Sequence, residues 1–324
     1  MAQTISRRRF LAASGAAILV GGCEHAIVPI DGMPIDPNNM IIDIHQHTGY
    51  LGRSDEELLA HQRNMGVTYT ILLPSGHPVE RPSTHMGKSN GLAAQCLPNE
   101  TCYRIAQDHP GKYYFFANEV PDVENAREEV ETYLKLGAKG VGEVKYNIDV
   151  ESPAFDVLAG LARDYNVPML CHFQVGMYNH GFDRFWRVLE KYPKTKFIGH
   201  AQTMWTNISR VVDQKNLMPK TAVQAGGLTD QYLRNYENFY ADISAGSGLN
   251  SLMRDEERAR AFLHRHQDKI MYGSDCADRT GKAPLCQGAD TIIAVKRLSV
   301  SEGIARKIFY ENAGRMFGIP VRWS

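Results

Sequence analysis

The stretch that decides the fold is MIIDIHQHTGY, residues 40–50, in which branched apolar residues lead into His45, Gln46 and His47. Side chains alternate between the two faces of a strand, so residues two apart point the same way. If this segment is a buried strand, His45 and His47 aim at one point. Neutral imidazole is the commonest protein metal ligand. The pair therefore predicts either a metal site or two hydrogen-bonded histidines at a strand end.

Seven more apolar segments follow, with helical patterns between them. The eight candidate strands cover residues 40–47, 67–74, 112–120, 138–146, 167–174, 195–202, 239–245 and 270–276. Residues 54–66 and 125–137 each begin with an N-cap residue and end with a glycine, as helices do. Strands that alternate with helices predict a parallel α/β sheet. Eight of them favour a (β/α)₈ TIM barrel, a single domain at 40–324, over an open doubly wound sheet.

Polar side chains that can bind metals gather at the predicted carboxyl ends of these strands. They are His45, His47, Glu143, Lys145, His172, His200 and Asp275. All strand ends of a barrel open onto one pocket, so these positions together predict a metal centre. Two long insertions, residues 75–100 and 203–238, follow strands on the same face and are expected to help bind the substrate.

The chain resembles the amidohydrolase superfamily, and specifically its amidohydrolase-related branch, through motifs that follow the family's order. These motifs are DIHQH (43–47), GVGEVKY (140–146), MLCHFQ (169–174), FIGHA (197–201), YGSDC (272–276) and ENAGRMFG (311–318). The resemblance implies that His45 and His47 hold a buried metal, with Asp275 as an axial ligand and catalytic base. It implies that His172 and His200 are further ligands. With one metal, His200 would act instead as an acid or electrophile.

The fourth strand leaves two residues open for the remaining ligand. Glu143 and Lys145 are two apart and both point into the barrel. GEVK resembles relatives in which the glutamate bridges two metals, so we expect Glu143 as the ligand and Lys145 as a substrate contact. A carboxylated lysine, or a simple pair between the two residues, is the alternative. Imidazole and carboxylate ligands suit one or two zinc ions, with manganese or iron also possible.

The resemblance implies a metal-dependent hydrolase in which a metal-activated water attacks a small-molecule C–N or C–O bond, in an amide, cyclic amide, lactone or ester. A decarboxylase of a small aromatic or enol acid is the alternative, and a glutamate on the fourth strand favours hydrolysis. A ligand-binding lipoprotein without activity is a third hypothesis, against which the intact ligand set argues. The expected substrate contacts are Lys145, Tyr146, Gln174, Trp205 and Arg81.

The first 39 residues have the features of an export signal and a tether. Residues 1–22 contain three consecutive arginines followed by Phe-Leu, which resembles a twin-arginine signal, and a short apolar run. VGGC at 20–23 resembles a lipoprotein processing site with Cys23 as the lipidated residue; a plain cleaved signal is the alternative. Residues 23–39 would then be a tether or an arm. The protein is expected in the periplasm or lipid-anchored at a bacterial cell envelope.

The charge of the chain limits the classes of molecule that it is expected to bind. The chain has 36 basic and 36 acidic residues, and removal of residues 1–22 leaves 33 basic residues, a formal charge of −3. We therefore expect a small-molecule substrate, with no nucleic acid and no membrane contact beyond the lipid. Whether the chain forms a homo-oligomer is left open by the sequence.

Six cysteines form no CxxC motif, so no cysteine zinc site is expected. Cys96 and Cys102 are candidates for a disulfide or for free thiols. Four histidines in helical patterns are expected at the surface: His61, His109, His264 and His266.

Overall fold

The computed structural model describes residues 39–85 and 95–321, so the predicted leader at 1–22 and Cys23 lie outside the described residues. Each of the eight predicted segments contains a strand, although every strand is shorter than its segment. The strands are β1 (Ile42–Gln46), β2 (Tyr69–Leu72), β3 (Tyr113–Phe115), β4 (Val141–Val144), β5 (Met169–His172), β6 (Phe197–His200), β7 (Phe239–Asp242) and β8 (Ile270–Met271).

The strands form a closed parallel barrel. Two ladders, β1-β2-β3 and β4-β5-β6-β7-β8, contain only parallel pairs. A parallel bridge between Ala117 and Val141 connects the first ladder to the second. On the other side, the Ile44 N–H donates to the Tyr272 carbonyl over 3.1 Å, which joins β1 to the segment after β8. The (β/α)₈ barrel is thus confirmed, and the open sheet is excluded.

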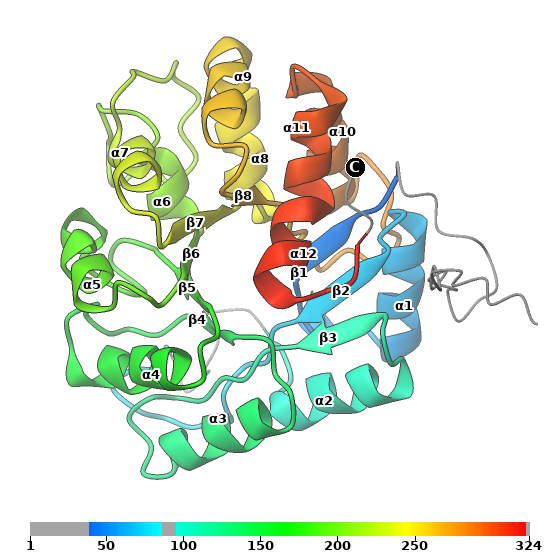
Figure 1. Cartoon of the computed structure of the whole chain (residues 1–324), viewed down its shortest axis with the longest axis vertical. Helices are drawn as coiled ribbons and strands as arrows, with labels where there is room; N and C mark the ends of the chain where they lie inside the picture. The colour runs from blue at the N-terminus through cyan, green and yellow to red at the C-terminus, as the bar shows by residue number, and fades with distance from the viewer. Residues whose placement is uncertain (1–38, 86–94, 322–324) are drawn as a thin grey trace, which may run out of the picture. The chain divides into compact units, whose positions relative to one another are not determined.

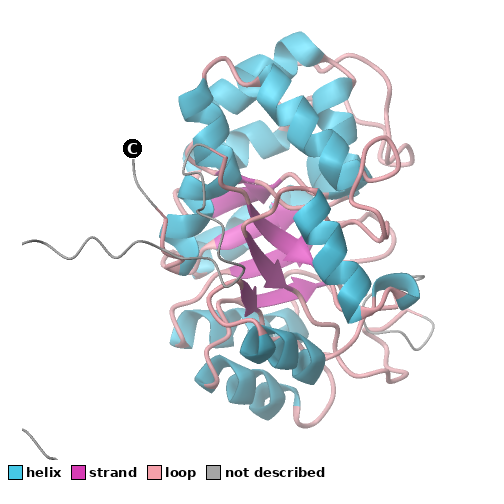
Figure 2. Cartoon of the chain, turned by 90° about the vertical axis from the view of Figure 1, so that its right-hand side faces the viewer, coloured by secondary structure: helices cyan, strands magenta, loops and turns pink. Residues whose placement is uncertain are grey.

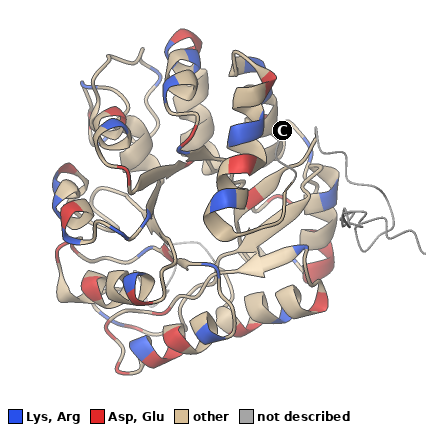
Figure 3. Ribbon diagram, viewed as in Figure 1, with Lys and Arg blue, Asp and Glu red and all other residues tan. Residues whose placement is uncertain are grey.

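Helices surround the strands, as Figures 1 and 2 show. They are α1 (Asp55–Asn64), α2 (Asn99–Asp108), α3 (Ala126–Lys135), α4 (Pro153–Asp164), α5 (Trp186–Lys191), α6 (Gln202–Thr206), α7 (Leu228–Asn235), α8 (Ala245–Met253), α9 (Glu256–Arg265), α10 (Gln287–Leu298), α11 (Glu302–Arg306) and α12 (Asn312–Phe317). Short 3₁₀ turns are η1 (Tyr50–Gly52) and η2 (Phe182–Arg184), and η3 (Lys307–Glu311) is a π-helical turn between α11 and α12. Charged residues of both signs alternate along these outer helices (Figure 3).

Local signals explain where two of the helices begin and end. The Ser54 hydroxyl accepts a hydrogen bond from the Glu57 backbone N–H, and the Glu57 carboxylate accepts one from the Ser54 backbone N–H, which completes a capping box at α1. Asn125 was expected to cap α3, but its side chain makes no capping hydrogen bond. Gly66 and Gly137 follow these helices with φ of 76° and 102°, a backbone conformation that favours glycine.

The barrel core is apolar and close-packed. Phe185 and Phe197, for example, meet edge to face with ring centroids 5.5 Å apart. Two histidines that were expected at the surface belong to the interior instead. His61 is fully buried, and His266 is buried and donates a 2.7 Å hydrogen bond from Nε2 to the Asp230 carboxylate. Among residues 39–85 and 95–321, no helix combines the length and apolar character needed to cross a bilayer.

Candidate metal centre

The carboxyl ends of β1 and β8 bring three predicted metal ligands together. His45 is the fourth residue of β1, His47 follows the strand, and their Nε2 atoms are 3.2 Å apart. Asp275 lies four residues past β8, where its backbone N–H donates to the His45 carbonyl over 2.8 Å. Asp275 has a φ of 41°, which strains a non-glycine backbone and is typical of functional sites. This conformation points its carboxylate at the two histidines.

The donor atoms are spaced as ligands of one ion are. Glu143 Oε2, from β4, lies 3.6 Å from His45 Nε2 and 3.4 Å from His47 Nε2. Asp275 Oδ1 lies 3.8 Å and 3.5 Å from the same two atoms. Tetrahedral ligands about 2.1 Å from a cation lie about 3.4 Å from one another. The four side chains therefore match the donor set and the spacing of a divalent cation.

Two buried donor atoms in this cluster have no hydrogen-bond partner among the described residues. They are Glu143 Oε2 and His200 Nε2, and both side chains are almost completely inaccessible. His200 Nε2 lies 3.6 Å from Glu143 Oε1 and 3.5 Å from Asp275 Oδ2. Buried polar atoms are nearly always satisfied, so orphaned ones call for an ion or a water. These two atoms fit a metal ligand set that includes His200.

Asp242 and Ser244 orient the histidines, and the sequence analysis did not single them out. Asp242 Oδ2, at the end of β7, lies 2.7 Å from His45 Nδ1. Ser244 Oγ lies 2.9 Å from His200 Nδ1 and donates to Asp242 Oδ2 over 2.8 Å. His47 Nδ1 lies 2.8 Å from the Leu73 carbonyl. With the Nδ1 atoms as donors, each ring turns an unprotonated Nε2 toward the centre, as metal ligands require.

Carboxylates surround the histidines of the centre. Burial opposes protonation of His45, but the surrounding carboxylates outweigh it and raise the pKa of His45 to about 10. Burial likewise opposes ionisation of Glu143 and Asp275. Lys145 and His45 nevertheless hold the pKa of Glu143 well below its usual range, and His45, His200 and His47 do the same for Asp275. Such a site attracts cations.

His172, on β5, lies beside the cluster and contacts it through Glu143. Its Nδ1 is 2.7 Å from Glu143 Oε1, and its Nε2 is 3.1 Å from Gln174 Oε1. Burial and the nearby Lys145 lower the pKa of His172 to about 4, which leaves the ring neutral near pH 7. A ligand role for His172 remains a prediction.

The five expected substrate contacts occupy different environments. Gln174 lies next to His172, and Lys145 is half-buried with its Nζ 5.9 Å from the Tyr178 ring centroid. Tyr146 is fully buried. Trp205 is 2% exposed, and its indole N–H donates to the Asp242 carbonyl over 3.0 Å, which ties it to the core beneath the site. Arg81 is an exposed loop residue.

One more side chain at the centre was missed. Tyr50, in η1, meets the His47 ring edge to face with centroids 5.0 Å apart. Burial and the adjacent Asp275 carboxylate raise its pKa well above the usual value, so its hydroxyl stays protonated. Its place in the quoted stretch, three residues after His47, was the available signal.

The family model described as amidohydrolase matches residues 42–319, which is nearly all of the described chain. No curated protein matches the sequence.

Solved structures with a similar fold include the following three. One, from Acinetobacter baumannii, is described as a probable 2-pyrone-4,6-dicarboxylic acid hydrolase; it shares 14% identity over 86% of this chain and 99% of its own, with a TM-score of 0.55. The 5-carboxyvanillate decarboxylase of Sphingomonas paucimobilis shares 14% identity over 87% and 100%, with a TM-score of 0.54. An uncharacterized TIM-barrel protein from Bordetella bronchiseptica shares 14% identity over 86% and 99%, with a TM-score of 0.58.

Proposed function

The chain belongs to the amidohydrolase family, and from that premise we propose that it is a metal-dependent hydrolase of a small-molecule C–N or C–O bond. Its substrate would be an amide, cyclic amide, lactone or ester. The observation that carries the proposal is the cluster of His45, His47, Glu143 and Asp275, whose donor atoms surround one point with Glu143 Oε2 left unpaired.

These four residues, with His200, would hold one or two divalent ions, zinc being the best match to imidazole and carboxylate ligands and manganese or iron the alternatives. Such an ion lowers the pKa of water from about 16 to about 7 and so supplies hydroxide near neutral pH. Asp275 reaches toward both sides of the centre, with Oδ1 facing His47 and Oδ2 facing His200. Its carboxylate is placed to take the proton of the attacking water and to return it to the leaving group.

His200 has its Nδ1 held by Ser244, so its Nε2 points into the centre. There it serves as a ligand or, when protonated, donates a hydrogen bond to the scissile oxygen. Lys145 follows β4 and Gln174 follows β5, at the carboxyl ends of these strands, and both are the proposed contacts for polar groups of the substrate. Lys145 is the nearby cation, so it suits a carboxylate on the substrate.

The alternative is a decarboxylase of an aromatic or enol acid. The A. baumannii protein is described as a hydrolase and the S. paucimobilis protein as a decarboxylase, and both resemble this fold equally. Glu143 supports hydrolysis, because its unpaired oxygen supplies a carboxylate donor on the fourth strand. A non-catalytic lipoprotein is the least supported hypothesis, since the whole donor set is present.

The test uses the metal-loaded full chain and a panel of lactones, cyclic amides, esters and aromatic acids, with proton release and CO₂ release recorded together. We expect proton release without CO₂ from one substrate class. Asp275→Asn should abolish turnover, whereas Asp183→Asn, at a side chain that is 82% exposed, should retain it. CO₂ release would favour the decarboxylase, and full turnover by Asp275→Asn would refute the role of Asp275.

We also propose that residues 1–22 direct export and that Cys23 carries a lipid. The support is the sequence pattern alone. Cell fractionation and mass spectrometry of the mature protein test it. A paired Arg7→Lys and Arg8→Lys variant should accumulate unprocessed in the cytoplasm, and Cys23→Ala should lose the lipid mass. A wild-type protein that keeps residues 1–22 would refute both steps.

A further inference from the structure

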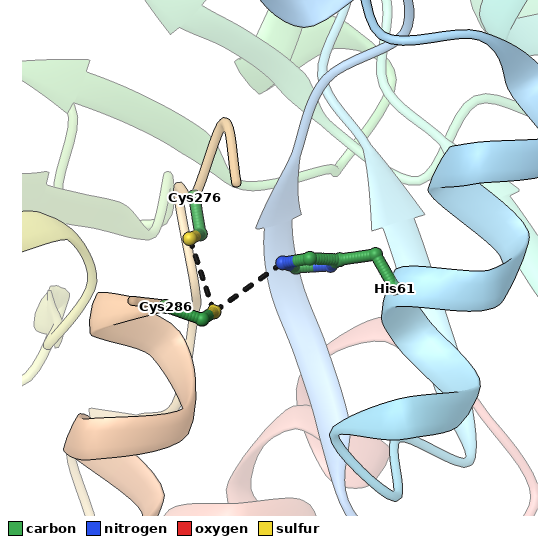
Figure 4. Close-up of side chains that lie close together, drawn as sticks. All are labelled: His61, Cys276 and Cys286. Atoms are coloured by element: carbon green, nitrogen blue, oxygen red, sulfur yellow. Dashed lines mark hydrogen bonds between the residues drawn. The ribbon is translucent and has the colours of Figure 1, made fainter. Parts of the chain in front are cut away.

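Three side chains that are distant in the sequence meet in a second buried cluster, which the proposed chemistry does not use. His61 comes from α1, Cys276 follows Asp275, and Cys286 directly precedes α10 (Figure 4). The two sulfur atoms are 3.0 Å apart, and His61 Nε2 is 3.3 Å from Cys286 Sγ. All three side chains are at most 2% exposed, and both cysteines are free thiols. This cluster is therefore a built arrangement in the interior and not a chance contact at the surface.

The spacing of the sulfur atoms suits a covalent bond better than a shared metal. Two thiolates on one tetrahedral zinc ion lie about 3.8 Å apart, because each Zn–S bond is about 2.3 Å. A disulfide needs about 2.05 Å. The observed 3.0 Å is already too short for a zinc dithiolate, whereas a disulfide requires the two sulfurs only to come closer. The histidine adds a group that can accept a thiol proton.

We propose that Cys276 and Cys286 form an intramolecular disulfide when a hydroperoxide oxidises them. His61 Nε2 takes the Cys286 proton, and the thiolate attacks one peroxide oxygen. The S–O bond forms, the O–O bond breaks, and the leaving group takes a proton to become an alcohol or water. The Cys276 sulfur then attacks the sulfenic sulfur of Cys286; the S–S bond forms, and the hydroxide leaves as water with the second proton. Two thiols lose two electrons, and the peroxide gains them.

The disulfide would fix the loop that carries a predicted metal ligand. Cys276 is adjacent to Asp275, and Cys286 is adjacent to Gln287, whose side-chain amide donates to the Asp275 carbonyl over 2.7 Å. The Cys276 carbonyl also accepts a 2.9 Å hydrogen bond from Arg53. A bond between the two sulfurs closes residues 276–286 into a ring at this point. We expect it to limit the motions that would release Asp275.

Peptide mapping of the folded full chain tests the bond directly. Trypsin cuts after Lys269, Arg279, Lys282 and Lys296, so the two cysteines fall in the separate peptides 270–279 and 283–296. After peroxide treatment and alkylation without reduction, we expect these peptides as one linked species that dithiothreitol separates. Recovery of both peptides as alkylated free thiols would overturn the proposal. The protein with the bond should melt roughly 5 °C above its reduced form.

Variants distinguish the proposed disulfide from a metal site and from nonspecific oxidation of thiols. His61→Gln should form the same linked peptides roughly tenfold more slowly or slower, because the proton acceptor is lost; an unchanged rate would refute the role of His61. Cys102→Ser, at another buried thiol, should leave the link and its rate intact. The bound metal per chain should be the same for wild type and Cys286→Ser. Loss of one metal equivalent in Cys286→Ser would overturn the disulfide in favour of a metal.

Discussion

Asp242→Asn is the sharpest test of how the metal centre is built. Asp242 accepts with both of its oxygens: Oδ1 from the Ser244 backbone N–H over 3.0 Å, and Oδ2 from the Ser244 hydroxyl over 2.8 Å. Oδ2 also lies 2.7 Å from His45 Nδ1. An asparagine has a single acceptor oxygen, so each orientation of its amide sets an N–H₂ group against a donor.

The size of the loss in stability or in metal affinity depends on which donor faces the new N–H₂ group. If the amide nitrogen faces the Ser244 N–H, a buried donor loses its partner, at a cost of about 1–3 kcal/mol in the free energy of unfolding. If it faces His45, the ring must move its proton to Nε2, the atom that faces the metal. Loss of the hydrogen-bond partner of a metal-binding histidine typically lowers metal affinity about 10–100-fold, which corresponds to about 1.4–2.8 kcal/mol. We expect weaker zinc binding together with lower stability.

The assay is competition for zinc between the purified full chain and a chromophoric chelator, with urea unfolding measured in parallel. Asp230→Asn is the matched control: Asp230, on α7, is a buried carboxylate 2.7 Å from His266 Nε2 that also pairs with Arg265. It should lose stability and keep its zinc affinity. The reasoning fails if Asp242→Asn binds zinc as tightly as Asp230→Asn does.

Four further predictions follow from single contacts. Glu143→Gln should reduce the metal bound per chain in elemental analysis, because it removes a charged donor. The pKa of His45 is raised from about 6.5 in the unfolded chain to about 10. Protonated His45 therefore stabilises the fold fully below pH 6.5, and this stabilisation is lost as the pH rises toward 10. Melting curves of the metal-free protein should show this loss, and those of the metal-loaded protein should not. Trp205→Phe deletes the 3.0 Å bond to the Asp242 carbonyl and should cost about 1 kcal/mol in urea unfolding. Ser54→Ala should cost about 1 kcal/mol and Ser54→Asp much less, since only the latter keeps a capping oxygen; thermal melts compare them.

The sequence was sufficient for the barrel because apolar strands and amphipathic helices alternate along the chain. The same alternation located every strand, and the polar residues at strand ends pointed to one pocket. Helices α2 and α10 were not anticipated: they follow long loops, and their N-cap residues, Pro98 and Cys286, lack the side-chain oxygen that Ser54 and Asn125 offered as a signal. Their positions depend on packing against the barrel, which the local sequence does not encode.

The sequence likewise revealed some residues of the candidate site and not others. His45 and His47 could be found because strand periodicity relates residues two apart. Asp242 lies in the middle of the predicted strand 239–245 and not at its end, and nothing local shows that its carboxylate meets His45 across the barrel. His61 and His266 were expected at the surface, because helical patterns do not reveal that Cys286 and Asp230 lie opposite them. Contacts between distant segments decide burial, and burial decides the chemistry.

Charge explains why this centre needs a cation. Glu143 and Lys145 were expected to be able to pair inside the barrel, yet no ion pair joins them in the described structure: Glu143 turns its oxygens to the histidines, and the Lys145 amine lies over Tyr178. Glu143, Asp242 and Asp275 therefore share one buried pocket with the histidine rings. Buried carboxylates are costly unless a positive charge lies among them. Without metal, the raised pKa of His45 means that a proton supplies that charge. A divalent cation supplies more of it at the same point and displaces the proton, so the affinity of the centre for metal should fall as the pH falls.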